Sequence, residues 1–492
     1  MTRKNIKEVY DIHKPFGYSV IIEDPLTHEV SYEVVEPVFN KTERKQYDLI
    51  QDFLAETIDV ILSELESPEA TEKYLRNKVR EIIKKYRIKV KRTSLGKMLY
   101  YLIRDYTGYG KINVMMEDPS IEDISCNGID VPLYIWHRTY ESIPSNVVFS
   151  SEKRLDNFII RMAYRTGRMI SLARPVLDSI LPDGSRINMT LGREVTKHGS
   201  TFTIRKFKAD PLTVIDMINY NTISTQMAAL FWLLIENKQN IFICGATASG
   251  KTSLLNTFTT FIQPDYKIVT IEDTPEIQLY HKNWIRSVSR ASVGSSTDID
   301  LFALLRTAMR QRPDYIIVGE IRGEEAYTLF QSLATGHGGM STLHADTVAA
   351  VIHRLETEPM NIPRPLITSL NVISIQQRLE REESPVRRTM VVSEIIELDT
   401  QTNEILTNEL FHYEPQHDSY SSLGRSYLLE KIADQTGRSM LEVNEDLEKK
   451  TRILAWMVDS GIRKFSEVTE IIRNYYNDPD DVYKLVEVGA QL

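Results

Sequence analysis

The chain has 492 residues, of which 42% are hydrophobic and 26% charged, and its formal net charge is −9 at pH 7. These values are ordinary for a folded protein of about two or three domains, and the acidic balance argues against nucleic-acid binding over the whole surface. Two cysteines are too few for a disulfide framework or a common zinc spacing, so we expect a reducing, intracellular compartment. A local basic groove remains compatible with this composition.

Residues 1–95 are expected to form a mainly helical layer. Between Lys41 and Lys91, acidic and basic residues mix with leucine and isoleucine at helical spacing. Such a pattern is typical of solvated helices. We expect no signal peptide, because no apolar stretch follows the charged residues at the start of the chain.

Residues 96–208 change to short segments of alternating polarity, which are typical of antiparallel strands. Segments of this kind occupy 132–136, 145–149, 186–189 and 200–205. A helix is expected over 152–166, so the sequence predicts a small α+β domain. Residues 209–212 contain a proline and are interpreted as the linker that leaves it.

From residue 213 to 424, apolar strands alternate with helical segments. The expected strands are Ile241–Cys244, Tyr266–Ile271, Tyr315–Val318, Met340–Leu343 and Met390–Ile396. This alternation predicts an α/β domain with a mostly parallel sheet, whose ligands bind at the carboxyl ends of the strands. Residues 425–492 return to helix and are expected to form a C-terminal helical subdomain. The longest wholly apolar run, 227–235, is nine residues long and too short to span a bilayer.

A phosphate-binding loop follows the first of these strands. It consists of Gly245, Ala246, Thr247, Ala248, Ser249, Gly250, Lys251 and Thr252, and a helical segment comes directly after it. A strand, a glycine loop and a helix in this order direct backbone N–H groups onto phosphate oxygens. Lys251 would reach the outer phosphates of a nucleoside triphosphate, and the Thr252 hydroxyl would hold Mg²⁺. The alternative is a glycine-rich turn of another α/β protein.

Polar residues follow three further strands and should lie beside the loop. Glu272 and Glu320 are candidates for orienting the attacking water, and Glu320 is also a candidate contact for Mg²⁺. Either carboxylate alone could instead cap the next helix. His337 and His344 are interpreted as sensors of the outer phosphate, with a structural role for His337 or a weakly supported zinc site as alternatives.

Three arginines of the small α+β domain lie at strand or loop positions rather than on a charged helix face. They are Arg174, Arg186 and Arg205. Arginines delivered from another domain or subunit can neutralise charge on a transferred phosphoryl group. The alternative is that each is an ordinary surface arginine.

These motifs resemble the ATPases of type II secretion, type IV pili, archaella and type IV DNA transfer. Four segments carry the resemblance in the family's order: 245–252, 270–276, 313–322 and 336–346. The segments 181–186 and 202–206 look like the family's arginine-bearing segments. Gly323 stands where many bacterial members have an aspartate, so the resemblance assigns no role to Arg322. Two isolated cysteines exclude the four-cysteine zinc insert of the bacterial secretion branch.

The resemblance implies a RecA-like ATPase domain preceded by a small PAS-like domain. It implies a homohexamer that uses ATP and Mg²⁺, with each ATP between the two domains of one subunit. Glu272 and Glu320 would be the catalytic carboxylates and His344 would complete the site. Arg186 and Arg205 would be arginine fingers, and Thr252 and Glu320 would contact the metal.

Segments at 33–37, 456–463 and 475–479 look like the archaeal branch of this family. The expected function is a motor for an archaellum or a type IV pilus, cytoplasmic and bound at the inner face of the membrane through a polytopic platform protein. A nucleic-acid partner is not expected. One alternative is a DNA-transfer ATPase of the same superfamily, and the other is a scaffold that binds ATP without hydrolysing it.

Overall fold

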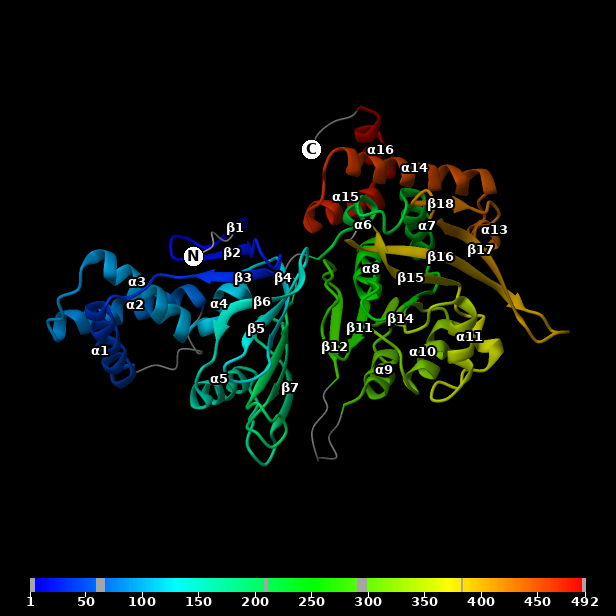
Figure 1. The fold of residues 1–492 in the computed structure, drawn as a ribbon. Coiled ribbons are helices and arrows are strands. Elements are labelled where there is room, and N and C mark those ends of the chain that lie inside the picture. Colours follow the sequence, from blue (N-terminus) through cyan, green and yellow to red (C-terminus); the bar gives the residue numbers. More distant parts are fainter. Residues whose placement is uncertain (1–4, 59–66, 208–210, 290–298, 382–383, 489–492) are drawn as a thin grey trace. The chain divides into compact units, whose positions relative to one another are not determined.

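The computed structural model describes residues 5–58, 67–207, 211–289, 299–381 and 384–488. The chain divides into two compact units, residues 1–208 and 209–492 (Figure 1). The expected linker at 209–212 is described only at its last two residues, which are in coil. No helix in the described ranges is long and apolar enough to cross a membrane.

Unit 1 contains a nine-stranded sheet in the order β1-β2-β3-β6-β5-β4-β9-β8-β7. Its strands are β1 (Asn5–His13), β2 (Gly17–Glu23), β3 (Val30–Val35), β4 (Ile121–Cys126), β5 (Pro132–His137), β6 (Glu141–Val148), β7 (Val176–Ile180), β8 (Arg186–Thr190) and β9 (Thr201–Arg205). The strands pair antiparallel except at β3 and β6, where Tyr32 lies opposite Ser145 in a parallel bridge.

The helices of unit 1 fall into two groups. The first group is α1 (Lys41–Thr57), α2 (Pro68–Lys85) and α3 (Arg92–Tyr106), which share a core of their own. The second group comprises the short η2 (Gly110–Ile112) and α4 (Asn113–Glu117), followed by α5 (Glu152–Arg165). The helix α5 packs Leu155, Phe158 and Ile159 into the core beneath the sheet.

The expectation that residues 1–95 are mainly helical is wrong for residues 5–35. These residues form β1, β2 and β3 and extend the sheet of the following region. Ile21 and Tyr32 are fully buried in the same core as β4 to β9. The strands are therefore stabilised by tertiary pairing with residues more than one hundred positions later, which local composition does not report.

The carboxylate of Asp118 anchors these first strands to the rest of unit 1. Asp118 is fully buried and accepts hydrogen bonds from the hydroxyls of Ser19 (2.9 Å) and Tyr32 (2.8 Å). Its other oxygen accepts from the backbone N–H of Ser120 (2.9 Å). The Lys206 ammonium donates to its backbone carbonyl. One acidic side chain thus accepts hydrogen bonds from side chains on β2 and β3, the strands near the N-terminus.

Unit 2 also contains a nine-stranded sheet, in the order β12-β11-β13-β14-β10-β15-β16-β17-β18. The strands are β10 (Ile241–Gly245), β11 (Ile268–Glu272), β12 (Trp284–Val288), β13 (Tyr315–Val318), β14 (Gly338–Leu343), β15 (Val372–Arg381), β16 (Ser384–Leu398), β17 (Ile405–Glu414) and β18 (Ser419–Ser422). The pairs from β12 to β15 are parallel, and those from β15 to β18 are antiparallel.

All five expected strands of unit 2 are present, but β16 has a different role from the one expected. It spans 384–398 rather than 390–396, and it pairs antiparallel with β15. The chain turns back after the parallel strands and adds an antiparallel meander at one edge. Because Ser374 to Arg381 alternate polar and apolar residues only in part, the sequence analysis did not identify β15.

Helices cover both faces of the unit 2 sheet. They are α6 (Val214–Asn219), α7 (Thr225–Glu236), α8 (Lys251–Phe258), η3 (Thr259–Phe261), α9 (Leu301–Met309), α10 (Glu325–Ala334), α11 (Val348–Glu356), α12 (Arg364–Ile367), α13 (Tyr427–Thr436), α14 (Met440–Asp459), α15 (Phe465–Asn477) and α16 (Pro479–Val488). One core includes α6 to α8 with α13 to α16, and the other includes α9 to α12. The apolar run 227–235 lies in α7, and every residue of this run is buried.

The C-terminal helices are attached to unit 2 by buried polar contacts as well as by apolar packing. The Lys450 ammonium, on α14, lies 3.0 Å from Glu236 of α7 and also pairs with Asp446. The Glu394 carboxylate, on β16, accepts from the backbone N–H groups of Tyr427 and Leu428 at the start of α13, both at 2.9 Å. The carboxylate therefore compensates the partial positive charge at this helix N-terminus.

The two cysteines are free thiols inside separate cores. Cys126 is 1% exposed at the end of β4, and Cys244 is fully buried in β10. Burial raises the pKa of both thiols above the ordinary range. Both side chains therefore act as small apolar groups in the core.

Replacing Asp118 with alanine should destabilise unit 1 by about 2–4 kcal/mol, because buried hydroxyl donors on two strands lose their acceptor. Tyr32→Phe removes one donor and leaves the acceptor satisfied, so it should cost only about 1 kcal/mol. Urea unfolding gives the two free energies, and hydrogen exchange of peptides covering 17–35 locates the effect. Equal stabilities of the Asp118→Ala variant and the wild type would contradict this role.

Candidate functional site

The loop between β10 and α8 has the backbone conformation that a phosphate cradle requires. Gly245, Ala248 and Gly250 have positive φ values of 150°, 62° and 92°. A Cβ at position 245 would overlap the carbonyl oxygen of Gln376 in the neighbouring β15, so only glycine fits there. Within the described residues, no side chain caps the N-terminus of α8. The N–H groups of its first turn are therefore left for an external acceptor.

Two side chains of the loop offer hydrogen-bond donors to such an acceptor. Lys251 is 8% exposed, and its ammonium donates to the carbonyl of Ala246 at 2.8 Å, across the loop. The Ser249 hydroxyl oxygen is buried and has no hydrogen-bond partner in the described part of the chain. A buried hydroxyl without a partner is costly, and a bound phosphate oxygen would satisfy it.

The register of the parallel strands brings the polar residues to one edge of the sheet. Cys244 of β10 lies opposite Leu343 of β14, and Val318 of β13 lies opposite Ser341 of β14. Ile271 of β11 lies opposite Val318. The residues that follow these strand ends are the phosphate loop, His344, Glu320 and Glu272. They therefore occupy the same edge, as the sequence analysis expected.

A chain of polar contacts links the loop to the strand that carries Glu320. The His344 ring lies between two partners, with Nδ1 3.5 Å from the Lys251 ammonium and Nε2 3.0 Å from Glu320 Oε1. Because an ammonium only donates, Nδ1 is assigned as the acceptor and Nε2 as the protonated nitrogen. Burial, together with the charge of Lys251, lowers the pKa of His344 and favours the neutral ring.

Glu320 is held by a second cation. Arg322 forms an ion pair with its other carboxylate oxygen. The Arg322 side chain is 61% exposed, and the Glu320 side chain is 19% exposed. The sequence analysis assigned no role to Arg322, and the structure pairs it directly with the candidate catalytic carboxylate.

Glu272 occupies a more buried position at the end of β11. Its Oε1 atom accepts from the backbone N–H groups of Glu276 (2.7 Å) and Ile277 (2.8 Å). The Arg286 side chain approaches its other oxygen, with Nε 3.8 Å from Oε2. Burial outweighs these contacts and raises the pKa of Glu272 to about 7. A Cβ at Gly319 would come within 3.3 Å of its Cγ, so this glycine lets the β13 strand end approach Glu272.

His337 lies away from this edge. It precedes β14, whereas His344 follows the strand, so the two are separated by roughly 20 Å of extended chain. Its Nδ1 is 3.1 Å from the carbonyl of Ser332, in its own turn. The expectation that His337 senses the outer phosphate is therefore wrong. Among described residues no cluster of three potential ligands could hold a metal ion, so the zinc alternative has no support.

The candidate fingers lie in unit 1 on adjacent strands, and Asp123 of β4 lies opposite Arg205 on its other side. Arg186 of β8 and Arg205 of β9 are directly opposite in the antiparallel register, and both are exposed. Neither forms an ion pair or a hydrogen bond through its side chain with any described residue. Like charges opposite each other on a sheet are unfavourable, and the neighbouring Asp123 offsets part of this repulsion. Arg174 is also exposed, in the turn before β7.

One further arginine contacts the phosphate loop, and the sequence analysis missed it. Arg387 of β16 donates from Nε to the carbonyl of Ala248 at 3.2 Å. Its Cδ lies 3.0 Å from the position a Cβ would take at Gly250. The contact spans 139 positions of sequence and depends on the antiparallel return of β16. No local motif marks such a residue.

Comparison with known proteins gives matches over most of the chain. The family model described as "Type II/IV secretion system protein" matches residues 110–471. The Methanocaldococcus jannaschii protein MJ0900 is 38% identical over 394 residues, covering 79% of this chain and 71% of that protein. The conjugal transfer protein TrbB of Rhizobium radiobacter is 32% identical over 249 residues, covering 50% and 72%. The structure of the Legionella pneumophila ATPase DotB aligns with 18% identity and a TM-score of 0.44, covering 76% and 94%.

The raised pKa of Glu272 predicts a specific dependence of stability on pH. Between the ordinary pKa of 4.5 and about 7, the folded state binds more protons than the unfolded state. Stability is therefore lost as the pH rises through this window, by up to about 3 kcal/mol. Glu272→Gln stays neutral, so its stability relative to wild type should increase from pH 5 to pH 8, as measured by urea unfolding without nucleotide.

The matched control is Asp273→Asn, which removes an exposed carboxylate next in sequence. It should leave the pH dependence as in the wild type. If the difference between Glu272→Gln and wild type is constant from pH 5 to pH 8, Glu272 does not titrate in this range.

Proposed function

Because the chain belongs to the type II/IV secretion system protein family, we propose that it is an ATP-hydrolysing motor whose ATP site is built on the loop 245–252. The observation that carries this proposal is the contact chain from Lys251 through His344 to Glu320 at the end of the parallel strands. Through His344 it links Lys251, which would bind the outer phosphates, to Glu320, which would orient the attacking water. The fold of unit 2 supports a RecA-like arrangement, and the small sheet domain of unit 1 a PAS-like one.

The residues of the loop fit the phosphates of ATP. Gly245 and Gly250 leave room for a close approach of the backbone, and Ser249 offers an unpaired hydroxyl. Lys251 would exchange its present contact with the Ala246 carbonyl for oxygens of the outer phosphates. Thr252 and Glu320 would hold Mg²⁺, which supplies positive charge to the phosphate oxygens when bound. Arg322 engages one Glu320 oxygen, whereas Oε1 lies 3.0 Å from His344 Nε2 but accepts no hydrogen bond from the described residues, so Oε1 is the oxygen available to the metal or its bound water.

Glu272 and Glu320 would act on the attacking water in different ways, one as proton acceptor and the other by orienting it. In hydrolysis, the water oxygen bonds to the γ-phosphorus, the bond to the β–γ bridging oxygen breaks, and a proton leaves the water. The pKa of Glu272, about 7, suits a proton acceptor at neutral pH. Glu320 would orient the water, and the neutral His344 would donate from Nε2 and report the state of the outer phosphate.

Arg186 and Arg205 are proposed as the arginine fingers. Their side chains are exposed, unpaired within the described residues and adjacent across β8 and β9. Two neighbouring guanidinium groups would neutralise the charge that develops on the transferred phosphoryl group. Because these arginines and the phosphate loop belong to different units, hydrolysis would respond to changes across the 209–212 linker.

The motor is proposed to act as a homohexamer on a polytopic membrane platform protein, at the cytoplasmic face of the membrane. The similarity to a Methanocaldococcus jannaschii protein supports the archaeal branch, and therefore an archaellum or a type IV pilus as the driven structure. A second candidate is DNA transfer, since a protein named for conjugal transfer is 32% identical over half of the chain. Salt-sensitive stimulation of hydrolysis by DNA would favour that candidate.

Lys251→Ala should lower the affinity for ATP or the hydrolysis rate by at least about 100-fold, because it removes the charge that holds the outer phosphates. Lys282→Ala, an exposed lysine of the same unit, is the matched control and should match wild type. Nucleotide titration and steady-state phosphate release measure both effects. Undiminished activity of Lys251→Ala would remove the loop from the proposed function.

Glu320→Gln should bind ATP within a few-fold of wild type but hydrolyse it about 10²–10⁴ times more slowly, because the neutral amide cannot orient water as a carboxylate does. Glu324→Gln changes an exposed glutamate at the start of α10 and should hydrolyse ATP normally. Phosphate release under steady-state conditions separates the two variants. A wild-type protein that binds ATP but releases no phosphate would instead indicate the non-hydrolysing scaffold.

A further inference from the structure

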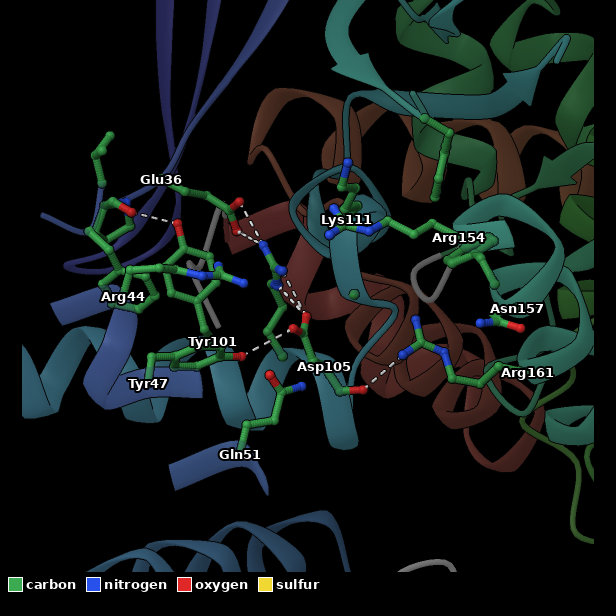
Figure 2. A pocket seen from close by; sticks show the side chains of 17 residues that line it. Glu36, Arg44, Tyr47, Gln51, Tyr101, Asp105, Lys111, Arg154, Asn157 and Arg161 are labelled. Atoms are coloured by element: carbon green, nitrogen blue, oxygen red, sulfur yellow. Dashed lines mark hydrogen bonds and ion pairs between the residues drawn. The ribbon is translucent and has the colours of Figure 1, made fainter. Parts of the chain in front are cut away.

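A cavity of about 820 Å³ lies within unit 1, apart from every residue assigned to ATP (Figure 2). Its walls come from the segment between β3 and α1, from α1 and α3, from the turn at 110–111, and from α5. Five of its lining side chains are cationic and two are acidic. The cations are Arg44, Arg104, Lys111, Arg154 and Arg161, and the acids are Glu36 and Asp105.

Both acids of this cavity are engaged by one arginine. The Arg104 guanidinium contacts the carboxylates of Glu36 (2.7 Å) and Asp105 (2.7 Å). Arg44 pairs with Asp48 at 3.0 Å, outside the cavity lining. Lys111, Arg154 and Arg161 have no carboxylate within ion-pair distance among the described residues. Five cations against Glu36, Asp105 and the Arg44 partner Asp48 leave a net charge of +2 at the cavity.

Of these three cations, Lys111 and Arg154 are exposed and Arg161 is half-buried. Arg154 and Arg161 are seven positions apart on α5 and share one face, with Asn157 between them. The Lys111 ammonium donates to the carbonyl of Val148 (3.1 Å) and lies 5.3 Å from the centre of the Phe149 ring. In Figure 2, the Arg154 side chain extends from α5 toward Lys111, and Arg161 extends toward Asp105.

Arg161 has a buried hydrogen-bond donor that the described part of the protein leaves without an acceptor. It donates to the backbone carbonyl of Asp105 (3.1 Å) and lies over the Phe158 ring, but its Nε atom is buried without a partner in the described structure. Burial and the neighbouring Arg165 lower the pKa of Arg161, and burial with Arg154 lowers that of Lys111. Neighbouring arginines thus disfavour the charged forms of Arg161 and Lys111, and Asp105 offsets part of this effect. A bound anion would relieve the remaining repulsion and the unmet donor.

We propose that this cavity binds a small anion that carries a polyphosphate group. Arg154 and Arg161 begin about 10 Å apart along α5, so a ligand that engages both ends needs more than one charged group. Guanidinium groups match phosphate oxygens in geometry, and Lys111 adds a point charge beside Arg154. The amides of Asn157 and Gln51 line the same cavity and offer neutral donors. The ligand would join α5 to the helices α1 and α3.

The test measures tripolyphosphate binding by calorimetry in the full chain carrying Lys251→Ala, so that the phosphate loop does not contribute. We expect one site in this background and at least a tenfold loss of affinity on adding Lys111→Gln and Arg154→Gln. Adding Lys153→Gln instead changes an exposed cation next to Arg154 that does not line the cavity. This control should bind within about twofold of the background.

Two further measurements locate the bound anion and check that the double variant is folded. Hydrogen exchange should show that tripolyphosphate protects peptides of α1, α3 and α5, and thermal melting should show that the double variant stays folded. Competition by ATP or by pyrophosphate then tells whether the natural ligand is a nucleotide or a free polyphosphate. Equal affinity in the folded double variant, protection confined to unit 2, or no binding of any of these anions at millimolar concentration would overturn the proposal.

Discussion

The parallel pairing of β10, β14, β13 and β11 is the constraint on which the candidate site depends. Each strand ends at the same edge of the sheet, so the residues that follow four separate segments meet within one region. A parallel sheet is buried on both faces, and helices cover both faces here. The geometry of the site is therefore set by strands that are packed on both faces. A shift of one residue in this register would separate Lys251, His344 and Glu320.

The sequence predicted those parts of the site that depend on residues close together in the chain. A phosphate loop between a strand and a helix, and a carboxylate or histidine after an apolar strand, are visible in a single stretch of residues. The pairing of Arg322 with Glu320 and the approach of Arg387 to Ala248 depend on side-chain placement and on the return of β16. The strands at 5–35 were missed for a related reason, because their burial is provided by residues distant in sequence. His337 and His344 belong to one motif, yet the length of β14 places them at opposite ends of the sheet.

Two sets of buried polar groups in the described residues contrast with each other. Asp118, Glu394 and Lys450 have their partners within the fold, and each attaches an element from elsewhere in the sequence to its unit. Around the phosphate loop and in the cavity of unit 1, by contrast, donors such as Ser249 Oγ and Arg161 Nε are buried without partners. Since folding alone does not satisfy these groups, they are the positions at which a ligand gains most from binding.

The burial of Cys126 and Cys244 makes the chain suitable for spectroscopic labelling. Thiol-reactive dyes need an accessible thiolate, and both native thiols are enclosed in apolar cores with a raised pKa. A cysteine introduced at an exposed position in each unit would therefore be the main point of attachment. A donor and an acceptor dye placed in this way would report the distance between the two units during nucleotide turnover, without replacement of either native cysteine.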